Sequence, residues 1–362
     1  MKLFLLLSLL CISGISSGQE TSKYHEEDVS FWNKTDSVQL HGTLTIPTIG
    51  KKFPVVLLIT GSGPQDRNET ILGHKPFKAI AEYLGDRGFA VLRYDDRGGG
   101  KMNKVFTNAT IDNFIKDASA GVDFLKTRTE INPKKIGLLG HSEGGSVAPV
   151  VATQRKDIAF VVLMAAPGVK HMELMKQQNR DLFRGMKLDS AAIETYVNDY
   201  YEDVFSGFGK GLDSTQQSQL ISSKLDLLRE KLSEKQLFNF MIPAKDKEAP
   251  YIRQVYQTSH GKWFQQFINF DPSVYLEQLT VPTLAVNGTK DVQVNADLNL
   301  RGIEKSLKKA GNKNYKIVKL EGLNHLMLPA KTGLPQEYAT IKGDIDPAFL
   351  ETVYHWLHGI YP

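Results

Sequence analysis

One serine of this chain lies in a sequence pattern that is typical of a catalytic nucleophile. Ser142 is in the segment GHSEGG (140–145), after the short apolar run 135–140 and before a helical segment that begins at Val147. A serine on a sharp turn between a strand and a helix is exposed at the edge of a sheet, where its hydroxyl can attack a carbonyl group. The glycines beside it allow neighbouring backbone to approach without Cβ clashes. The G-x-S-x-G pattern alone is common, and its place between strand and helix favours catalysis over a chance turn.

A serine nucleophile needs a base to accept its proton, and His325 is the candidate base. Five histidines follow Ser142, and His325 lies in the loop 321–325, directly after the last expected strand (315–320). In open α/β sheets the ligand site lies outside the carboxyl ends of the strands, so this loop is correctly placed. The other four histidines lie in an expected helical insertion or in the expected C-terminal helix: His171, His260, His355 and His358.

The base needs a carboxylate to orient it, and Asp291 is the candidate. Asp291 lies in the loop 287–291 after the strand 283–286, and therefore at the same edge of the sheet as Ser142. Two other aspartates are weaker candidates. Asp297 is expected to begin the next helix, and Asp271 precedes the strand and should lie at its opposite end.

A carbonyl group under attack also needs N–H donors for its developing negative charge. The backbone N–H of Glu143, the residue after the nucleophile, is one candidate donor. The other is the backbone N–H of Ser62, in the glycine-rich loop 60–63 after the apolar strand 55–59. We expect the Glu143 side chain to have a structural role, with a second catalytic acid as the alternative.

The spacing of apolar residues predicts an α/β fold. The run 55–59 is continuously apolar and rich in β-branched residues, as in strands that are buried on both faces of a parallel sheet. Helices alternate with such strands, which predicts a mostly parallel central sheet with helices on both faces. The expected elements are strands within 29–60, a helix (77–88), a strand (89–94), a helix (110–127), a strand (135–140), a helix from 147, strands (159–165 and 282–286), a helix (298–310), a strand (315–320) and a helix (349–358).

The alternation stops between residues 170 and 270, where we expect no buried strand. Apolar residues recur there at spacings of three and four, which predicts amphipathic helices. The expected organisation is therefore a core of residues 19–169 and 271–362, interrupted by a helical cap of residues 170–270. The two clearest sets of apolar residues are Ile193, Val197, Tyr200 and Val204, and Ile221, Leu225, Leu228 and Leu232.

The N-terminal residues 1–18 have the pattern of a signal peptide. Lys2 precedes the apolar run 3–12, and small residues up to Gly18 predict cleavage before Gln19. The run is short for a membrane span. We therefore expect an exported protein, periplasmic or secreted, with no stable membrane insertion after removal of the signal. Cleavage would also remove Cys11, the single cysteine, and with it any cysteine nucleophile.

Composition and charge exclude several classes of protein. The 362 residues carry a net charge of +4, from 44 Lys and Arg against 40 Asp and Glu. Basic residues are scattered among acidic ones, so we expect no nucleic-acid partner. With 41% hydrophobic and 23% charged residues, the chain is globular and not disordered. No spacing such as H-E-x-x-H predicts a metal site, so we expect neither metal nor other cofactor. The oligomeric state is left open.

These motifs together resemble the α/β-hydrolase superfamily and, more narrowly, exported bacterial serine esterases with a GHSEGG nucleophile elbow. The resemblance covers nearly all of the chain after the signal peptide. It implies an α/β-hydrolase fold with a helical cap between core strands six and seven, matching residues 170–270. Thr60 departs from the pattern, because many relatives have histidine before the oxyanion glycine. The segments that carry the resemblance are 61–67, 94–98, 140–145, 287–291 and 322–325.

The expected activity is hydrolysis of a small-molecule carboxylic ester through an acyl-enzyme formed on Ser142. A serine aminopeptidase similar to proline iminopeptidases is an alternative, which would need an acidic group for the substrate amine, such as Glu143 or Glu173. A thioesterase is a second alternative, and a non-catalytic binding protein on the same fold is a minor one. Several cap residues are candidates either for an acyl pocket or for packing the cap: Met172, Met175, Phe183, Met186, Trp263 and Phe264.

Overall fold

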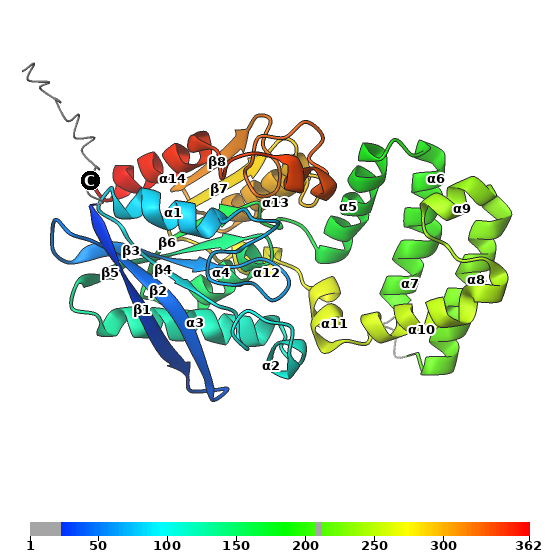
Figure 1. Cartoon of the computed structure of the whole chain (residues 1–362), viewed down its shortest axis with the longest axis horizontal. Helices are drawn as coiled ribbons and strands as arrows, with labels where there is room; N and C mark the ends of the chain where they lie inside the picture. Colours follow the sequence, from blue (N-terminus) through cyan, green and yellow to red (C-terminus); the bar gives the residue numbers. More distant parts are fainter. Residues whose placement is uncertain (1–22, 208–211) are drawn as a thin grey trace, which may run out of the picture.

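The computed structural model describes residues 23–207 and 212–362, and its strands form one eight-stranded sheet (Figure 1). The strand order is β1-β2-β4-β3-β5-β6-β7-β8. Strands β3 to β8 are parallel, whereas β2 pairs antiparallel with both β1 and β4. The mostly parallel sheet predicted from the sequence is confirmed. The strands are β1 (Tyr24–Asn33), β2 (Val38–Pro47), β3 (Phe53–Ile59), β4 (Ala90–Tyr94), β5 (Ile131–His141), β6 (Ile158–Met164), β7 (Thr283–Gly288) and β8 (Tyr315–Leu320).

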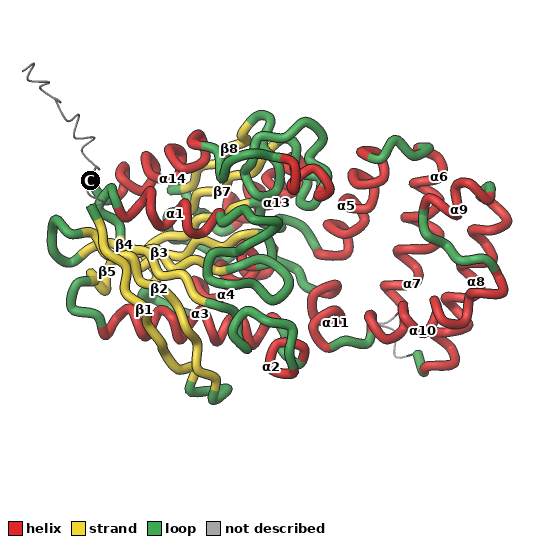
Figure 2. The backbone as a smooth tube through the Cα atoms, viewed as in Figure 1, coloured by secondary structure: helices red, strands yellow, loops and turns green. Residues whose placement is uncertain are grey.

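Helices cover both faces of the sheet (Figures 1 and 2). Alternate side chains of β3, from Val55 to Ile59, enter two separate hydrophobic cores, one on each face. This explains why that strand is apolar without interruption. One face is covered by α3 (Ile111–Thr127), α4 (Gly144–Gln154), α12 (Ser273–Leu276) and α13 (Ala296–Lys309), and the other by α1 (Pro76–Gly85) and α14 (Pro347–Ile360). The short helix α2 (Lys104–Thr107) follows β4.

Between β6 and β7, the described part of residues 171–269 consists of helices joined by short loops, with no strand, and we call this segment the cap. Figure 1 shows it beside the sheet, with α5 and α11 nearest the core. Its two ends meet, because the His171 N–H donates to the Phe270 carbonyl at 3.0 Å. The cap has its own hydrophobic core, which contains both sets of apolar residues that predicted these helices. Its elements are α5 (His171–Gly185), α6 (Ser190–Thr195), the π-helix η1 (Tyr196–Tyr201), α7 (Glu202–Gly207), α8 (Ser214–Lys231), α9 (Glu234–Asn239), the 3₁₀ turn η2 (Lys245–Lys247), α10 (Glu248–Ser259) and α11 (Lys262–Asn269).

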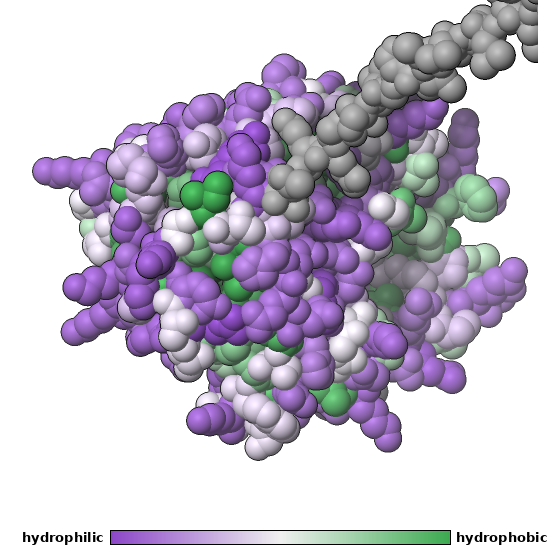
Figure 3. Space-filling model, turned by 60° about the vertical axis from the view of Figure 1, so that its left-hand side comes forward, coloured by the Kyte–Doolittle hydropathy of each residue, from purple (hydrophilic) through white to green (hydrophobic). Residues whose placement is uncertain are grey.

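The surface shown in Figure 3 is mainly hydrophilic, with apolar side chains in small separate spots. Within residues 23–207 and 212–362, no helix combines the length and hydrophobicity that crossing a membrane requires. The predicted signal peptide, residues 1–18, lies outside the described residues. Its removal and the export of the protein stay predictions.

The helix after Ser142 begins earlier than the sequence predicts. The sequence predicts that this helix starts at Val147, whereas α4 begins at Gly144. Glycine has a low helix propensity, so the first turn of α4 carries no helical signal in the sequence. Close packing around the turn requires glycine at positions 144 and 145, and this requirement outweighs the low helix propensity of glycine.

Candidate active site

Ser142 occupies a strained turn between β5 and α4. Its φ is +53°, in the left-handed region that residues with a side chain seldom adopt. The Ser142 N–H donates to the Met164 carbonyl of β6 at 3.0 Å, which fixes the turn against the neighbouring strand. Such a turn presents the serine hydroxyl at the carboxyl edge of the sheet, as a nucleophile elbow requires.

The glycines of the elbow are needed because backbone lies against them. A Cβ at Gly140 would lie 2.1 Å from the Gly144 carbonyl oxygen, and a Cβ at Gly144 would lie 2.2 Å from the Ile59 carbonyl oxygen. Neither backbone oxygen can move aside as a flexible side chain could. The two glycines therefore allow β3, β5 and α4 to meet beneath Ser142.

We expect Gly140→Ala to destabilise the fold by about 3 kcal/mol or more, because the added methyl group overlaps backbone in a packed core. Urea unfolding would measure the loss. Gly359→Ala is the matched control, since Gly359 is in α14 with no heavy atom within 4 Å of the added Cβ. This control should be neutral or slightly stabilising. Equal stability of the two variants would contradict the packing argument.

His325 and Asp291 form a hydrogen-bonded pair at the same edge of the sheet. The distance from His325 Nδ1 to Asp291 Oδ2 is 2.8 Å. The other carboxylate oxygen accepts from the N–H groups of Gln293 and Val294, both at 2.8 Å. Pairing of Nδ1 with a carboxylate favours the tautomer that carries its proton on Nδ1, in which Nε2 is the nitrogen that can act as a base. Of the two weaker candidates, Asp297 is exposed and paired with Lys319, and Asp271 accepts a hydrogen bond from the Ser273 hydroxyl.

Ser142 and His325 line the same cavity, of about 380 Å³. Leu174, Met175 and Gln178 of α5 and Trp263, Phe264 and Phe267 of α11 form its cap side. Three of the six cap residues proposed for an acyl pocket are therefore in the cavity wall: Met175, Trp263 and Phe264. Of the others, Met172 and Phe183 pack into the core of the cap, and Met186 is exposed. The core loops contribute further residues, among them Gln65, Leu72, Gln293, Leu326 and Tyr338.

The two expected oxyanion donors lie beside the nucleophile. A Cβ on Gly61, the residue before Ser62, would be only 3.1 Å from the Ser142 Cβ. Within the described chain, neither the Ser62 N–H nor the Glu143 N–H donates a hydrogen bond. Both groups are therefore available to a developing oxyanion, which is the arrangement that acyl transfer requires.

Comparisons with known proteins agree with this architecture. A family model described as serine aminopeptidase, S33, matches residues 74–206. The chain is 29% identical over 354 residues to esterase EstD of Thermotoga maritima, covering 96% of this chain and 73% of that protein. It superposes on the esterase Pf2001 of Pyrococcus furiosus with a TM-score of 0.52, 18% identity and coverage of 93% and 91% of the two chains. The α/β hydrolase GrgF of Penicillium superposes with a TM-score of 0.53 and 15% identity, covering 92% of this chain and 98% of that one. The chain has the α/β-hydrolase fold.

In this α/β-hydrolase fold the Glu143 side chain is buried behind the candidate oxyanion donors. Its carboxylate accepts a hydrogen bond from the indole Nε1 of Trp263, at 2.7 Å, and one from the Ser62 hydroxyl. Burial raises the pKa of Glu143 to about 7, although both hydrogen bonds oppose the shift. The carboxyl group is fully engaged, which agrees with the structural role expected from the sequence.

Asp96, which lies just after β4, binds the loop that contains Thr60 and Ser62. Its carboxylate accepts from the Thr60 hydroxyl at 2.7 Å and from the Gln65 N–H at 2.8 Å. Thr60, the residue that departs from the family pattern, therefore has a defined partner. Burial, with smaller contributions from the Glu69 and Glu143 carboxyl groups, raises the pKa of Asp96 to about 8 against the opposing effect of these two hydrogen bonds.

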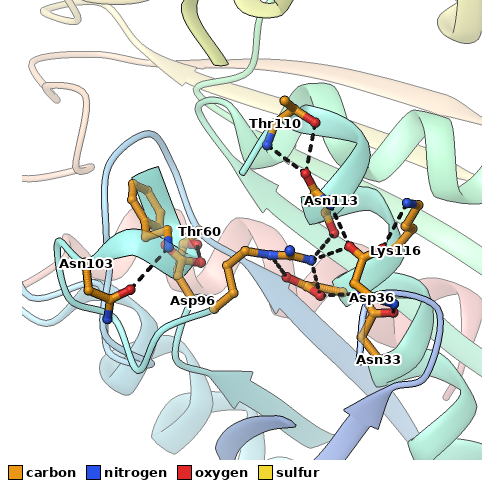
Figure 4. Close-up of polar contacts among 11 residues, drawn as sticks. Asn33, Asp36, Thr60, Asp96, Asn103, Thr110, Asn113 and Lys116 are labelled. Atoms are coloured by element: carbon orange, nitrogen blue, oxygen red, sulfur yellow. Dashed lines mark hydrogen bonds and ion pairs between the residues drawn. The ribbon is translucent and has the colours of Figure 1, made fainter. Parts of the chain in front are cut away.

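Ion pairs fix the loop that carries Asp96. The Arg97 guanidinium pairs with Asp117 at 2.8 Å and with Asp36 at 2.9 Å. Figure 4 shows Asp36 beside Asn113 and Lys116, which both donate to it. This network of ion pairs holds Asp96 beneath residues 60–62.

The sequence does not indicate that His141 and Glu69 form a buried pair beside Ser142. His141 Nδ1 lies 2.8 Å from Glu69 Oε1, and its Nε2 lies 3.0 Å from the His325 carbonyl oxygen. Burial alone would lower the pKa of His141, but the Glu69 carboxylate outweighs burial and the pKa is raised. His141 is adjacent to Ser142 in sequence, whereas nothing in the sequence around Glu69 points to this pairing.

We expect Glu143→Gln to stabilise the folded protein at pH 8 and to leave its stability unchanged near pH 4. The folded state holds the Glu143 proton up to about pH 7, whereas the unfolded chain releases it near its ordinary value of 4.5. Stability should therefore fall as pH rises through this window, by up to about 3 kcal/mol, and the amide removes that loss. Urea unfolding at the two pH values would measure it.

Glu248→Gln provides a control of opposite sign. Burial of Glu248 is outweighed by hydrogen bonds from Ser222, Arg229 and Lys245, which lower its pKa. Its charged form therefore stabilises the fold, and the amide should reduce stability at pH 8. A uniform response of both variants across pH would contradict the burial argument for Glu143.

Proposed function

We propose that this α/β-hydrolase cleaves carboxylic esters by way of an acyl-enzyme on Ser142. The observation that carries the proposal is that Ser142, on its strained turn, lines one largely apolar cavity together with His325, which is hydrogen-bonded to Asp291. His325 Nε2 accepts the Ser142 proton as the Oγ attacks the ester carbonyl carbon. The N–H groups of Ser62 and Glu143 then bind the oxyanion.

The second half of the reaction uses the same groups. Collapse of the tetrahedral intermediate breaks the bond to the alcohol oxygen, which takes the proton from His325 and leaves. Water then loses a proton to His325 and attacks the acyl carbon. The carboxylic acid leaves and the proton returns to Ser142.

The cavity wall favours an uncharged substrate. Most of the residues that line it are aliphatic or aromatic, and no lysine or arginine is among the described lining residues. Its polar groups include the carboxamides of Gln65, Gln178 and Gln293. Its volume of about 380 Å³ is at the small end of the range for ligand pockets. We infer that short and medium acyl chains fit better than long ones.

The acidic residues of the site favour an ester over a peptide with a free amino terminus. An aminopeptidase needs an unpaired carboxylate near the scissile bond, and Glu143 is buried with its carboxylate bound to Trp263 and Ser62. Glu69 is paired with His141. Glu173 is 53% exposed and paired with Lys176. Each of the three is therefore already paired, and only Oε2 of Glu69, which is buried, has no hydrogen-bond partner among the described residues.

The test is a series of p-nitrophenyl esters from acetyl to palmitoyl, run beside the p-nitroanilide of proline. We expect turnover of the short and medium esters that depends on Ser142, and much slower or no release from the anilide. Preferential cleavage of the anilide would replace the proposal with an aminopeptidase. A matched thioester would show whether the acyl pocket also accepts a sulfur leaving group.

We also propose that the enzyme acts outside the cytoplasm, in the periplasm or the medium. The support is the apolar run 3–12 after Lys2, followed by small residues up to Gly18. N-terminal sequencing of the protein recovered from the producing cells should give Gln19 as the first residue, and recovery of an intact Met1 would contradict export by this route.

A further inference from the structure

Three successive residues of the oxyanion loop are each held by a different buried carboxylate. The loop consists of residues 60–62, and each of them donates one hydrogen bond to a carboxylate oxygen. The Thr60 hydroxyl donates to Asp96 at 2.7 Å, the Gly61 N–H donates to Glu69 at 2.7 Å, and the Ser62 hydroxyl donates to Glu143.

The three carboxylates come from separate parts of the core. Glu69 follows the loop itself, Asp96 lies two residues after β4, and Glu143 immediately precedes α4. Their exposures are 0%, 7% and 3%. Burying a carboxyl group costs free energy at neutral pH, either because its charge is poorly compensated or because the group must take up a proton. Neutral side chains would hold a loop at lower cost, so this arrangement is not explained by stability alone.

Two of the carboxylates also contact other parts of the site. Glu69 binds His141, whose other ring nitrogen contacts the His325 carbonyl oxygen. Glu143 accepts from Trp263, which lies in α11 and lines the cavity. Glu69 therefore connects the oxyanion loop, through His141, to the loop that carries His325. Glu143 connects the oxyanion loop, through Trp263, to the cap.

We propose that Glu69, Asp96 and Glu143 are positioning residues for the oxyanion hole, and that Glu143 makes this positioning depend on the cap through Trp263. The inference rests on the proposed function, because it concerns the oxyanion of the same reaction. An oxyanion hole works because its donors are held in place before charge develops. A displacement of about 1 Å at a reacting group can cost about 100-fold in rate. The Ser62 N–H is positioned by the loop that the carboxylates hold.

The first test compares Glu143→Ala with Glu143→Gln on p-nitrophenyl acetate. We expect Glu143→Ala to lower kcat by about 10- to 100-fold with KM changed less than about 3-fold, since the loss falls on the transition state. Glu143→Gln should keep kcat within about 3-fold, because its amide oxygen can accept from Trp263 and its NH₂ group can donate to the Ser62 hydroxyl. Each rate is divided by the amount of Ser142 that an organophosphorus inhibitor labels when the labelling reaction has gone to completion. Misfolded chains are therefore excluded from the calculated kcat.

The second test addresses the cap contact. Trp263→Phe should lower kcat in the wild-type background by about 3- to 10-fold and have little further effect in Glu143→Ala, because the two changes remove the same contact. The matched controls are Trp356→Phe, whose ring packs against Phe160, and Glu248→Ala, a buried carboxyl group in α10 that binds Arg229. Both should leave kcat per labelled serine within about 2-fold.

The outcomes separate this inference from the proposed function. Equal kcat values for the wild type and Glu143→Ala, or additive effects of Glu143→Ala and Trp263→Phe, would overturn the positioning role while leaving the esterase intact. A wild-type protein without ester turnover that depends on Ser142 would overturn both. A loss in Glu143→Ala that Glu143→Gln restores, together with non-additivity, supports the proposal.

Discussion

Ser142→Ala is expected to lower kcat for a short p-nitrophenyl ester by at least about four orders of magnitude. The rate falls this far because no acyl-enzyme can form without the serine hydroxyl. Substrate binding and the oxyanion donors alone support only a small residual rate. Alanine fits the site, so the fold should be retained. Steady-state kinetics with protein purified separately from the wild type would measure the loss.

A nearby serine supplies a demanding control for this variant. Ser146 lies in α4, and its hydroxyl is 3.0 Å from His171 Nε2, so it too forms a serine–histidine pair. Both residues are buried, neither lines the cavity, and burial lowers the pKa of His171 to about 3. Ser146→Ala should therefore keep kcat within about 3-fold. Comparable losses in the two variants would mean that the assay reports folding and not nucleophilic attack.

Asp291→Asn is expected to lower kcat by about 10³- to 10⁴-fold with little change in structure. One oxygen of Asp291 is held by the N–H groups of Gln293 and Val294, and the amide oxygen of asparagine should occupy that position. The NH₂ group then faces His325 Nδ1, which must lose its proton. The proton moves to Nε2, where it blocks acceptance from Ser142.

Asp297→Asn is the matched control for the carboxylate assignment. Asp297 is close in sequence but exposed and paired with Lys319, so its amide variant should keep kcat within about 2-fold. Single-turnover acylation rates would locate the defect of Asp291→Asn in the chemical step. A large loss in Asp297→Asn with normal rates in Asp291→Asn would show that the orienting carboxylate has been misassigned.

The parts of the fold and site that were predictable from sequence are those with local signals. The continuous apolar run of β3 identifies a strand buried on both faces, and the glycines around Ser142 identify a sharp turn. Asp291 and His325 were recognisable because each follows a strand directly, and the parallel sheet brings such loops to one edge.

The supporting contacts were not predictable because they join distant segments. Glu69 meets His141 across 72 positions and Trp263 meets Glu143 across 120, and no periodicity marks either pair. The cap shows the same limit. Apolar spacing identified its helices, but Met172 and Met175 are three residues apart and only Met175 reaches the cavity. Which side of a helix faces a pocket depends on tertiary packing.

The two ends of the cap meet at the hydrogen bond from the His171 N–H to the Phe270 carbonyl. This arrangement affects which parts of the sequence can change during evolution. The chain leaves the sheet after β6 and returns before β7 at nearly the same place, and the cap packs around a core of its own. Insertions and deletions in the intervening segment therefore need not change the order of the strands, provided that Trp263 and its contact with Glu143 are kept. Substrate choice can evolve in the rest of the cap under that one constraint.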